Sequence, residues 1–310
     1  MARRTERRSR RGVLRGLQEP RGVGEPRNRD TASTGDELIR AVFCDLDGTL
    51  VRPDGLVLDE DIDLLRQVSA GGARLVFVTG RPSRCLSDLP AALKELSLRI
   101  VTSNGASEVV DGRTLILAPL DGQRVRDFCE ALRRVDPHVS FATEFESAFG
   151  YEPGYAWWPA TDTGADGFCA DITELTSSVL PITKLLCRSG DLNAGDLTRK
   201  AQALGFEVTI TYSCTPQEGG PVEVLSPLAS KGHAVRRILE EAGVTPAEAV
   251  AFGDRANDIP MLECVGEAVV IGAPVEPRLA AFPCADSVGT WLAAHDDRWR
   301  THHLDTGGTT

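Results

Sequence analysis

Beyond residue 35, apolar runs alternate with amphipathic segments along the chain. Uninterrupted apolar runs predict buried strands at 41–44, 74–78 and 99–102. Between the first two, residues 59–72 begin with acidic side chains, carry apolar residues at helical spacing and end in Gly71-Gly72, which predicts a helix. Strands that alternate with helices predict right-handed βαβ units and a parallel sheet.

Two further elements are predicted in this first part of the chain. Residues 84–96 are expected to form a helix. Residues 108–117 predict a β-hairpin that turns at Asp111-Gly112, because this dipeptide suits a two-residue turn with positive φ angles.

The pattern changes at about residue 121. A helix is predicted at 121–135 and a helical stretch at 192–204. Strand-like segments lie at 139–145, 181–188, 206–213 and 221–226. This arrangement favours an α+β unit with antiparallel pairing.

After Pro227 the first pattern returns, with an amphipathic helix at 230–243 and apolar strands at 249–253 and 267–272. The predicted fold class is therefore α/β, with a Rossmann-like core of parallel strands and an inserted α+β domain. The predicted divisions are an Arg-rich tail at 1–34, a discontinuous core at 35–119 and 226–295, the insertion at 120–225, and a flexible tail at 296–310.

Charge is distributed unevenly along the chain. The net charge is −11, yet residues 1–30 hold ten arginines and four acidic residues, so this segment is +6 and the other 280 residues are −17. Such an acidic body disfavours nucleic acid as a partner. The tail reads as a disordered extension, and an arm for nucleic acid or an anionic surface is the alternative.

The eight cysteines are scattered, without any C-x-x-C pair, and no apolar run is long enough to span a membrane. The arginine pair Arg10-Arg11 is not followed by a hydrophobic stretch, which excludes a twin-arginine signal. These features predict reduced thiols and a cytoplasmic location. They leave the oligomeric state open.

Polar residues follow four of the predicted strands. These are Asp45 and Asp47, Thr79, Ser103-Asn104, and Asp254 with Asn257 and Asp258. The carboxyl ends of parallel strands share one edge of a sheet, where ligands bind. The four groups are therefore expected to converge on one site.

The residue types at this edge suggest phosphoryl transfer. Asp45, Asp47 and Asp254 would repel one another unless a hard cation such as Mg²⁺ lay among them. Mg²⁺ in such sites commonly completes its shell with water and phosphate oxygens. Thr79, backbone amides and Lys231 can neutralise or hydrogen-bond phosphoryl oxygens.

Other phosphate-binding and hydrolytic motifs are missing from the sequence. It contains no G-x-x-x-x-G-K-[ST], no G-x-S-x-G and no cysteine followed six residues later by arginine. A carboxylate nucleophile remains, and such nucleophiles are known for phosphoryl groups.

Five motifs together resemble the haloacid dehalogenase superfamily. They are DLDGTL at 45–50, TGR at 79–81, SNGA at 103–106, SKG at 230–232 and GDRANDIPML at 253–262. With the insertion between the second and third of the superfamily's motifs, the chain is similar to Cof-type phosphatases of subclass IIB, which carry a C2B cap. The resemblance spans about residues 38–295 and implies an Mg²⁺-dependent phosphoric monoester hydrolase.

The resemblance also implies roles for individual residues. Asp45 would be the nucleophile and Asp47 the general acid and base, while Thr79 and Lys231 would complete the catalytic set. Asp45, Asp254 and the backbone carbonyl of Asp47 would hold Mg²⁺, with Asp258 supporting Lys231 or a metal-bound water. The phosphate or substrate contacts would come from Gly48, Gly80, Arg81, Asn104 and Asn257.

The substrate is expected to be a small phosphate ester, with sugar phosphates favoured. A phosphomutase or phosphotransferase that uses the same aspartyl phosphate is the main alternative, and a binding protein that keeps the fold without turnover is another. In the insertion, Tyr155, Trp157 and Trp158 are expected to pack in its core rather than wall the substrate. Glu144 or Glu146 can accept substrate hydroxyls, whereas Lys184 is interpreted as a structural residue.

Overall fold

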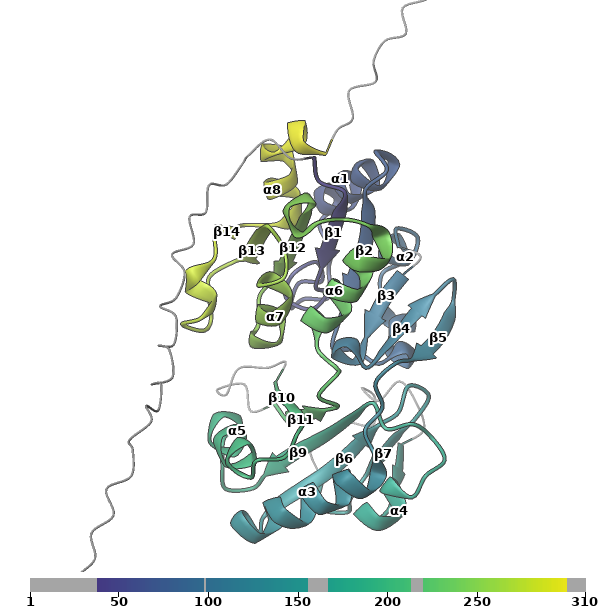
Figure 1. Ribbon diagram of the computed structural model, residues 1–310, viewed down its shortest axis with the longest axis vertical. Helices are drawn as coiled ribbons and strands as arrows, with labels where there is room; N and C mark the ends of the chain where they lie inside the picture. The colour runs from purple at the N-terminus through teal and green to yellow at the C-terminus, as the bar shows by residue number, and fades with distance from the viewer. Residues whose placement is uncertain (1–37, 98, 156–166, 213–219, 300–310) are drawn as a thin grey trace, which may run out of the picture. The chain divides into compact units, whose positions relative to one another are not determined.

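The computed structural model describes residues 38–299, except 98, 156–166 and 213–219. The described chain forms two sheets (Figure 1). The predictions about Trp157, Trp158 and the tail at 1–34 lie outside the described residues. Within the described part, no helix combines the length and apolar character needed to cross a bilayer.

The larger sheet has eight strands, in the order β14-β13-β12-β1-β2-β3-β4-β5. All neighbours from β14 to β3 pair in parallel, whereas β3, β4 and β5 are antiparallel. The strands are β1 (Ala41–Cys44), β2 (Arg74–Val78), β3 (Arg99–Thr102), β4 (Ser107–Val110), β5 (Arg113–Ile116), β12 (Ala249–Gly253), β13 (Glu267–Ile271) and β14 (Cys284–Ala285). The predicted parallel core is confirmed.

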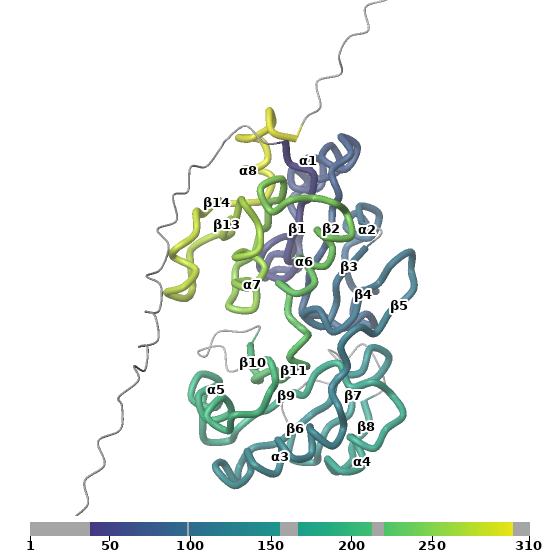
Figure 2. Tube along the Cα trace, viewed as in Figure 1, coloured from purple at the N-terminus to yellow at the C-terminus, as the bar shows by residue number. Residues whose placement is uncertain are grey.

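Helices cover both faces of this sheet. On one face, α1 (Asp59–Ala70) and α8 (Val288–Ala294) pack over a cluster that includes Phe77 and Phe252. On the other face, α6 (Lys231–Ala242) and α7 (Ile259–Leu262) pack over a cluster that includes Phe43. The two clusters place helices on both sides of the sheet, which gives three layers, and Figure 2 traces the path of the chain through these elements. Burial of both faces explains why the central strands are continuously apolar.

The second sheet is mixed and mainly antiparallel, in the order β10-β11-β9-β6-β7-β8. Its strands are β6 (Val139–Glu144), β7 (Phe149–Tyr151), β8 (Gly167–Cys169), β9 (Lys184–Ser189), β10 (Thr209–Thr211) and β11 (Val222–Leu225). The helices of this part are α3 (Gly122–Val135), α4 (Ile172–Thr176) and α5 (Ala194–Ala203), and α3 and α5 pack over a separate apolar cluster. This arrangement confirms the predicted α+β insertion, called the cap below. The predicted boundaries at 119/120 and 225/226 stay predictions.

Two predictions about local structure are corrected. The helix expected at 84–96 is instead a 3₁₀ helix, Ser83–Asp88, and the short α2, Ala91–Lys94. Pro90 separates them. Proline has no backbone N–H to donate, so it interrupts the hydrogen bonding that would continue the helix. Within the flexible tail predicted at 296–310, Asp296–Arg298 form a 3₁₀ turn and Trp299 is buried, which corrects the prediction for these four residues. Residues 300–310 lie outside the described part of the chain.

Candidate active site

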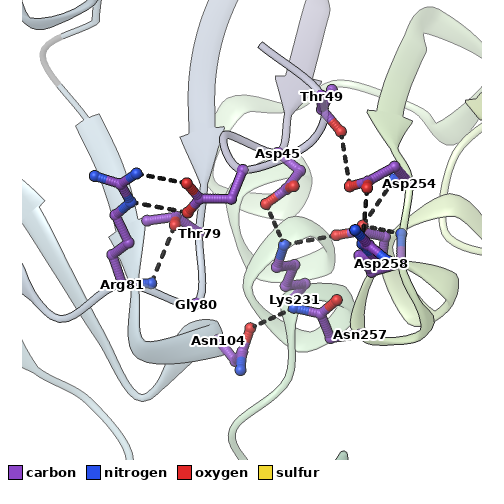
Figure 3. Close-up of polar contacts among 12 residues, drawn as sticks. Asp45, Thr49, Thr79, Gly80, Arg81, Asn104, Lys231, Asp254, Asn257 and Asp258 are labelled. Carbon is purple, nitrogen blue, oxygen red and sulfur yellow. Dashed lines mark hydrogen bonds and ion pairs between the residues drawn. The ribbon is translucent and has the colours of Figure 1, made fainter. Parts of the chain in front are cut away.

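The predicted convergence of strand ends is observed. Asp45 follows β1, Thr79 follows β2, Ser103 and Asn104 follow β3, and Asp254 follows β12. These four strands are neighbours in the order β12-β1-β2-β3 and run parallel, so their carboxyl ends open at the same edge. Figure 3 shows the resulting group of side chains.

Lys231 lies at the centre of the group. Its Nζ donates to Oδ1 of Asp45 at 2.5 Å and to Oδ1 of Asp258 at 2.6 Å, and all three side chains are buried. Lys231 is the first residue of α6, whose N-cap Ser230 accepts a hydrogen bond from the backbone N–H of His233. The cap residue thereby fixes where the helix begins and delivers the lysine to the strand edge.

Burial and charge perturb these groups strongly. Burial and the repulsion from Asp258 hold the pKa of Asp45 well above its usual range, although Lys231 lowers it. Burial alone would lower the pKa of Lys231, but Asp258 and Asp45 raise it above the ordinary value. Burial and Asp258 also raise the pKa of Asp254 to about 6. Perturbed groups of this kind concentrate at functional sites.

A divalent cation suits the carboxylates in this group. Ligand atoms of Asp45, Asp254 and Asp258 lie within 4.8 Å of one another, and all three residues are buried. Burial and mutual repulsion raise the pKa of Asp45 and of Asp254, and a hard cation among these carboxylates would offset both effects. The described residues therefore fit Mg²⁺ chemistry.

Asp258 is already engaged on both oxygens. Its Oδ1 accepts from Lys231, and its Oδ2 accepts from the backbone N–H groups of Asp254 at 3.0 Å and Arg255 at 2.9 Å. This places Asp258 as a support for Lys231 and for the loop that carries Asp254. Asp254 is engaged as well, because its Oδ1 accepts from Thr49 and its Oδ2 lies 2.9 Å from Nε of Arg255. All three carboxylates therefore stay candidate ligands for a cation.

Gly48 allows the close approach of Asp254. Its φ of +89° lies in the left-handed region, and a Cβ at this position would lie 2.2 Å from Oδ2 of Asp254. Thr49, the next residue, donates to Oδ1 of Asp254 at 3.3 Å. A side chain at position 48 would therefore displace the Asp254 carboxylate, which gives the glycine of the DLDGT motif a physical reason.

Asp47 points away from the buried carboxylates. Its two oxygens accept from Nε and Nη2 of Arg81 at 2.8 and 2.5 Å, and its side chain is about half exposed. The carboxylate of Asp47 is therefore not part of the carboxylate cluster, and only its backbone carbonyl remains as the ligand that the sequence predicted. Arg81, predicted to contact phosphate, contacts Asp47 in this state.

The turn that follows β2 can hold a phosphoryl group. Oγ1 of Thr79 accepts from the backbone N–H of Arg81 at 3.0 Å, which leaves the hydroxyl hydrogen able to donate to an anion. Asn104 and Asn257 lie farther along the edge, where Nδ2 of Asn257 donates to Oδ1 of Asn104 at 3.1 Å. The structure thus brings all the predicted residues to one edge, while their roles remain predictions.

A cavity of about 430 Å³ opens above Asp45 and Asp47, between the core and the cap. Its lining includes Gly80, Arg81, Arg84, Asp88, Glu144, Lys184, Glu223 and Arg255. Arg84 and Glu144 form a buried ion pair at 2.7 Å. Among these residues, sequence reasoning overlooked Arg84 and Glu223 and assigned Lys184 a purely structural role. The sequence carried a signal for Lys184 and Glu223, because each is a charged residue within a mainly apolar strand, β9 and β11 respectively.

Two predictions for the cap can now be compared with the structure. Tyr155 is buried in a small cluster with Ala142, Phe149 and Leu186, so it packs in the cap as expected. Glu146, predicted as a possible acceptor for substrate, accepts from the backbone N–H of Ser83 and from the hydroxyls of Ser103 and Ser107. It therefore ties the cap to the core in this structure.

The fold and this edge define the class of the protein. The sequence profile of the haloacid dehalogenase-like hydrolases matches residues 42–281, and the chain belongs to this family. The predicted superfamily and the hydrolase class that it implied are therefore confirmed. A phosphate ester substrate follows from this family.

Two relatives of this chain are named as phosphatases of one compound, HMP-PP. The HMP-PP phosphatase of Cronobacter sakazakii is 26% identical over 272 residues, which cover 84% of this chain and 94% of that protein. The HMP-PP phosphatase of Enterobacter sp. is 26% identical over 284 residues, covering 86% and 97%.

Two solved structures are similar to the whole fold. A subclass IIB sugar phosphatase has a TM-score of 0.67 at 18% identity, covering 83% of this chain and 99% of that one. A phosphatase of the superfamily from Bacteroides thetaiotaomicron has a TM-score of 0.70 at 20% identity, covering 87% and 100%. At these identities the two structures establish the fold.

Proposed function

We propose that this protein is an Mg²⁺-dependent phosphatase that hydrolyses small phosphomonoesters, with sugar phosphates favoured, through an aspartyl phosphate at Asp45. The observation that carries the proposal is the position of Asp45. Its carboxylate lies at the end of β1, bonded to Lys231 and beside Asp254, where an open cavity reaches it. A buried carboxylate with a cation and an access route suits nucleophilic attack on phosphorus.

The first half-reaction transfers the phosphoryl group to the protein. One Oδ of Asp45 bonds to phosphorus while the bond from phosphorus to the ester oxygen breaks. Asp47 donates a proton to that departing oxygen, so the alcohol leaves neutral. Lys231 neutralises charge on the nucleophile and phosphate, and Thr79 donates to a phosphoryl oxygen.

The second half-reaction restores the enzyme. Water attacks phosphorus, its proton passes to the carboxylate of Asp47, and the bond from phosphorus to Asp45 breaks. Asp45 returns as a carboxylate and inorganic phosphate leaves. The exposure of Asp47 at the mouth of the cavity supports this role, because an acid–base group must reach both the leaving oxygen and water.

Mg²⁺ would be held by Asp45, Asp254 and the backbone carbonyl of Asp47. When bound, it supplies positive charge that stabilises the transferring phosphoryl group. Asp258 acts through Lys231 and through the backbone of Asp254, as its hydrogen bonds indicate.

The cavity lining supports a hydroxyl-rich leaving group. Arg84 and Glu144, which pair with each other, lie in this lining together with Asp88 and with Arg255, which pairs with Asp254. A sugar hydroxyl both donates and accepts, so it can bind between groups of opposite charge. The relatives named HMP-PP phosphatase make HMP-PP a second substrate to compare.

The test is phosphate release from a panel that contains hexose phosphates, nucleotides, HMP-PP and p-nitrophenyl phosphate, with Mg²⁺ and with EDTA. Release that requires Mg²⁺ and is fastest with hexose phosphates supports the proposal. A preference for HMP-PP would overturn the sugar preference. Slow hydrolysis combined with bisphosphate-dependent conversion of a hexose 1-phosphate would favour the phosphomutase alternative, and no release from any ester would sink the phosphatase proposal.

A further inference from the structure

Lys184 and Glu223 form an ion pair on the cap that faces the core. They lie on the neighbouring strands β9 and β11, with Nζ of Lys184 3.5 Å from Oε1 of Glu223. Their side chains are only 5% and 7% exposed. Two charges at this depth need other partners to offset the loss of hydration.

The other partners of the pair lie on two loops of the core. Nζ of Lys184 donates to the carbonyl oxygen of Gly80 at 2.9 Å, in the turn after β2. Oε2 of Glu223 accepts from Nδ2 of Asn104 at 2.6 Å, in the turn after β3. A single ion pair of the cap therefore contacts both of the core turns that follow β2 and β3.

Both of these turns adjoin groups of the proposed active site. Gly80 follows Thr79, the proposed donor to phosphate. Asn104 accepts a hydrogen bond from Asn257. Asp258, which follows Asn257 in the chain, accepts a hydrogen bond from Lys231. A shift of either turn would therefore move a group that must be aligned with the phosphoryl oxygens or the nucleophile.

The turn at Asn104 has an uncommon backbone geometry and receives contacts from the cap. Ser103 and Asn104 have φ angles of 49° and 55°, in the left-handed region that residues with a side chain adopt less readily than glycine. The cap carboxylates hold both residues, because Glu146 accepts from the hydroxyl of Ser103 at 2.6 Å and Glu223 accepts from Asn104. Within the core, the backbone N–H groups of Ser103 and Asn104 donate to the carbonyl oxygens of Arg81 and Thr79, so the cap carboxylates add side-chain contacts to a turn that the core also holds.

The energetics of the pair disfavour a simple stabilising role. Desolvation of two buried charges commonly cancels the gain from their attraction. Lys184 nevertheless remains charged, because Glu223 and Glu144 raise its pKa above the ordinary value although burial opposes this. When the cap separates from the core, water can hydrate both charges, so the pair adds little net free energy to docking and the closed state can form reversibly.

We propose that Lys184 and Glu223 are positioning residues, which set the turns at Gly80 and Asn104 for phosphoryl transfer only when the cap is docked on the core. The proposal rests on the proposed phosphatase function. It assigns a role to a contact between cap and core, and neither side chain is required to touch the substrate.

The test measures Lys184→Met, Lys184→Arg, Glu223→Gln and the double variant Lys184→Met/Glu223→Gln on two substrates. p-Nitrophenyl phosphate lacks sugar hydroxyls, whereas glucose 6-phosphate carries them. We expect Lys184→Met to lower kcat about 10- to 100-fold on both substrates, because small misalignments at a reacting centre have effects of this size. KM should change little, Lys184→Arg should restore much of the rate, and the double variant should be no slower than Lys184→Met.

Arg133→Met is the matched control, because Arg133 forms an ion pair with Glu152 within the cap and away from the cavity. It should retain the kcat of the unchanged protein. Amide hydrogen exchange over residues 79–84 gives a second readout that needs no turnover, and it should be faster in Lys184→Met and Glu223→Gln than in Arg133→Met.

A loss restricted to glucose 6-phosphate would overturn the positioning role, because it would show that Lys184 contacts the leaving group. Unchanged kcat together with unchanged exchange would also overturn it. If the unchanged protein releases no phosphate, the proposed function fails, and the exchange over residues 79–84 still decides whether the pair orders the turn.

Discussion

The core and the cap both bury charged side chains, but they do so in different ways. In the core, Asp45, Asp254 and Lys231 converge because parallel strands and one helix start meet at a single edge. In the cap, Glu144, Lys184 and Glu223 lie on separate antiparallel strands and find partners across the cavity. The core arrangement collects the proposed catalytic groups at one edge, whereas the cap arrangement depends on contacts with the core.

The largest effect is expected from removing the nucleophile. Asp45→Asn should lower phosphate release by at least about 10⁴-fold, because removing a covalent nucleophile disables the whole sequence of steps. Initial rates with p-nitrophenyl phosphate measure the loss, and a cooperative thermal transition shows that the variant folds. Residual activity within tenfold of the unchanged protein would contradict the assignment of Asp45.

The next largest effect concerns the cation. Asp254→Asn, or removal of Mg²⁺ by EDTA, should lower kcat about 100-fold or more, because the cation neutralises charge that develops in the transition state. Raising the Mg²⁺ concentration should partly restore Asp254→Asn. Full activity in EDTA would refute the metal requirement.

The effect of Mg²⁺ on stability should depend on pH. The pKa of Asp254 is raised to about 6 from an ordinary value of 3.8, so between these values the folded, metal-free protein binds a proton that the unfolded chain releases. With respect to this group, lowering the pH therefore stabilises the metal-free protein. Protonation also competes with Mg²⁺, which binds the carboxylate form.

The increase in Tm caused by Mg²⁺ should consequently be large at pH 7.5 and small at pH 5. Thermal denaturation at both pH values measures this difference. Samples without added Mg²⁺ and samples treated with EDTA are the references. An increase in Tm that is equal at both pH values would show that Asp254 is not among the ligands.

A smaller effect, which depends on the substrate, is expected from the cap. Glu144→Gln should raise KM for glucose 6-phosphate about tenfold, because a hydrogen bond to a charged acceptor is lost or weakened, and should change p-nitrophenyl phosphate little. Glu152→Gln is the matched control, since Glu152 is a buried cap carboxylate that pairs with Arg133. Equal losses on both substrates would place Glu144 among the groups that support the cap as a whole.

The smallest effect is expected from the Arg-rich segment. Deleting residues 1–34 should leave kcat and KM unchanged, because the proposed site is built from residues 45–258. Salt-dependent binding to nucleic acid that disappears with the deletion would support the alternative of a basic arm. Equal binding by both proteins would exclude it.

Much of the core could be predicted from the sequence, because the pattern itself reports it. Apolar runs that end in polar residues mark β1, β2, β3 and β12, and parallel pairing then brings their ends together. The turn at Asp111-Gly112 could also be predicted from the sequence, because this dipeptide favours positive φ angles, and the observed angles are 49° and 74°.

The remaining features depend on tertiary contacts. The orientation of Asp47 toward Arg81 depends on a side-chain pair 34 residues apart, and the contact of Lys184 with Gly80 depends on how the cap docks. Trp299 lies beyond any clear periodic pattern yet is buried beside the core, with its indole N–H donating to Leu292. Sequence periodicity cannot reveal such partners, because it reports only one element at a time.

The most direct test of the account is to trap the phosphoryl group on the protein. The enzyme is mixed with p-nitrophenyl phosphate and Mg²⁺, quenched in acid within the first turnovers, and digested for mass spectrometry. We predict one added phosphoryl group on the peptide that contains Asp45, and borohydride reduction of that acyl phosphate should convert residue 45 to homoserine. A phosphoryl group on another residue, or phosphate release without any labelled peptide under conditions that stabilise acyl phosphates, would contradict the account.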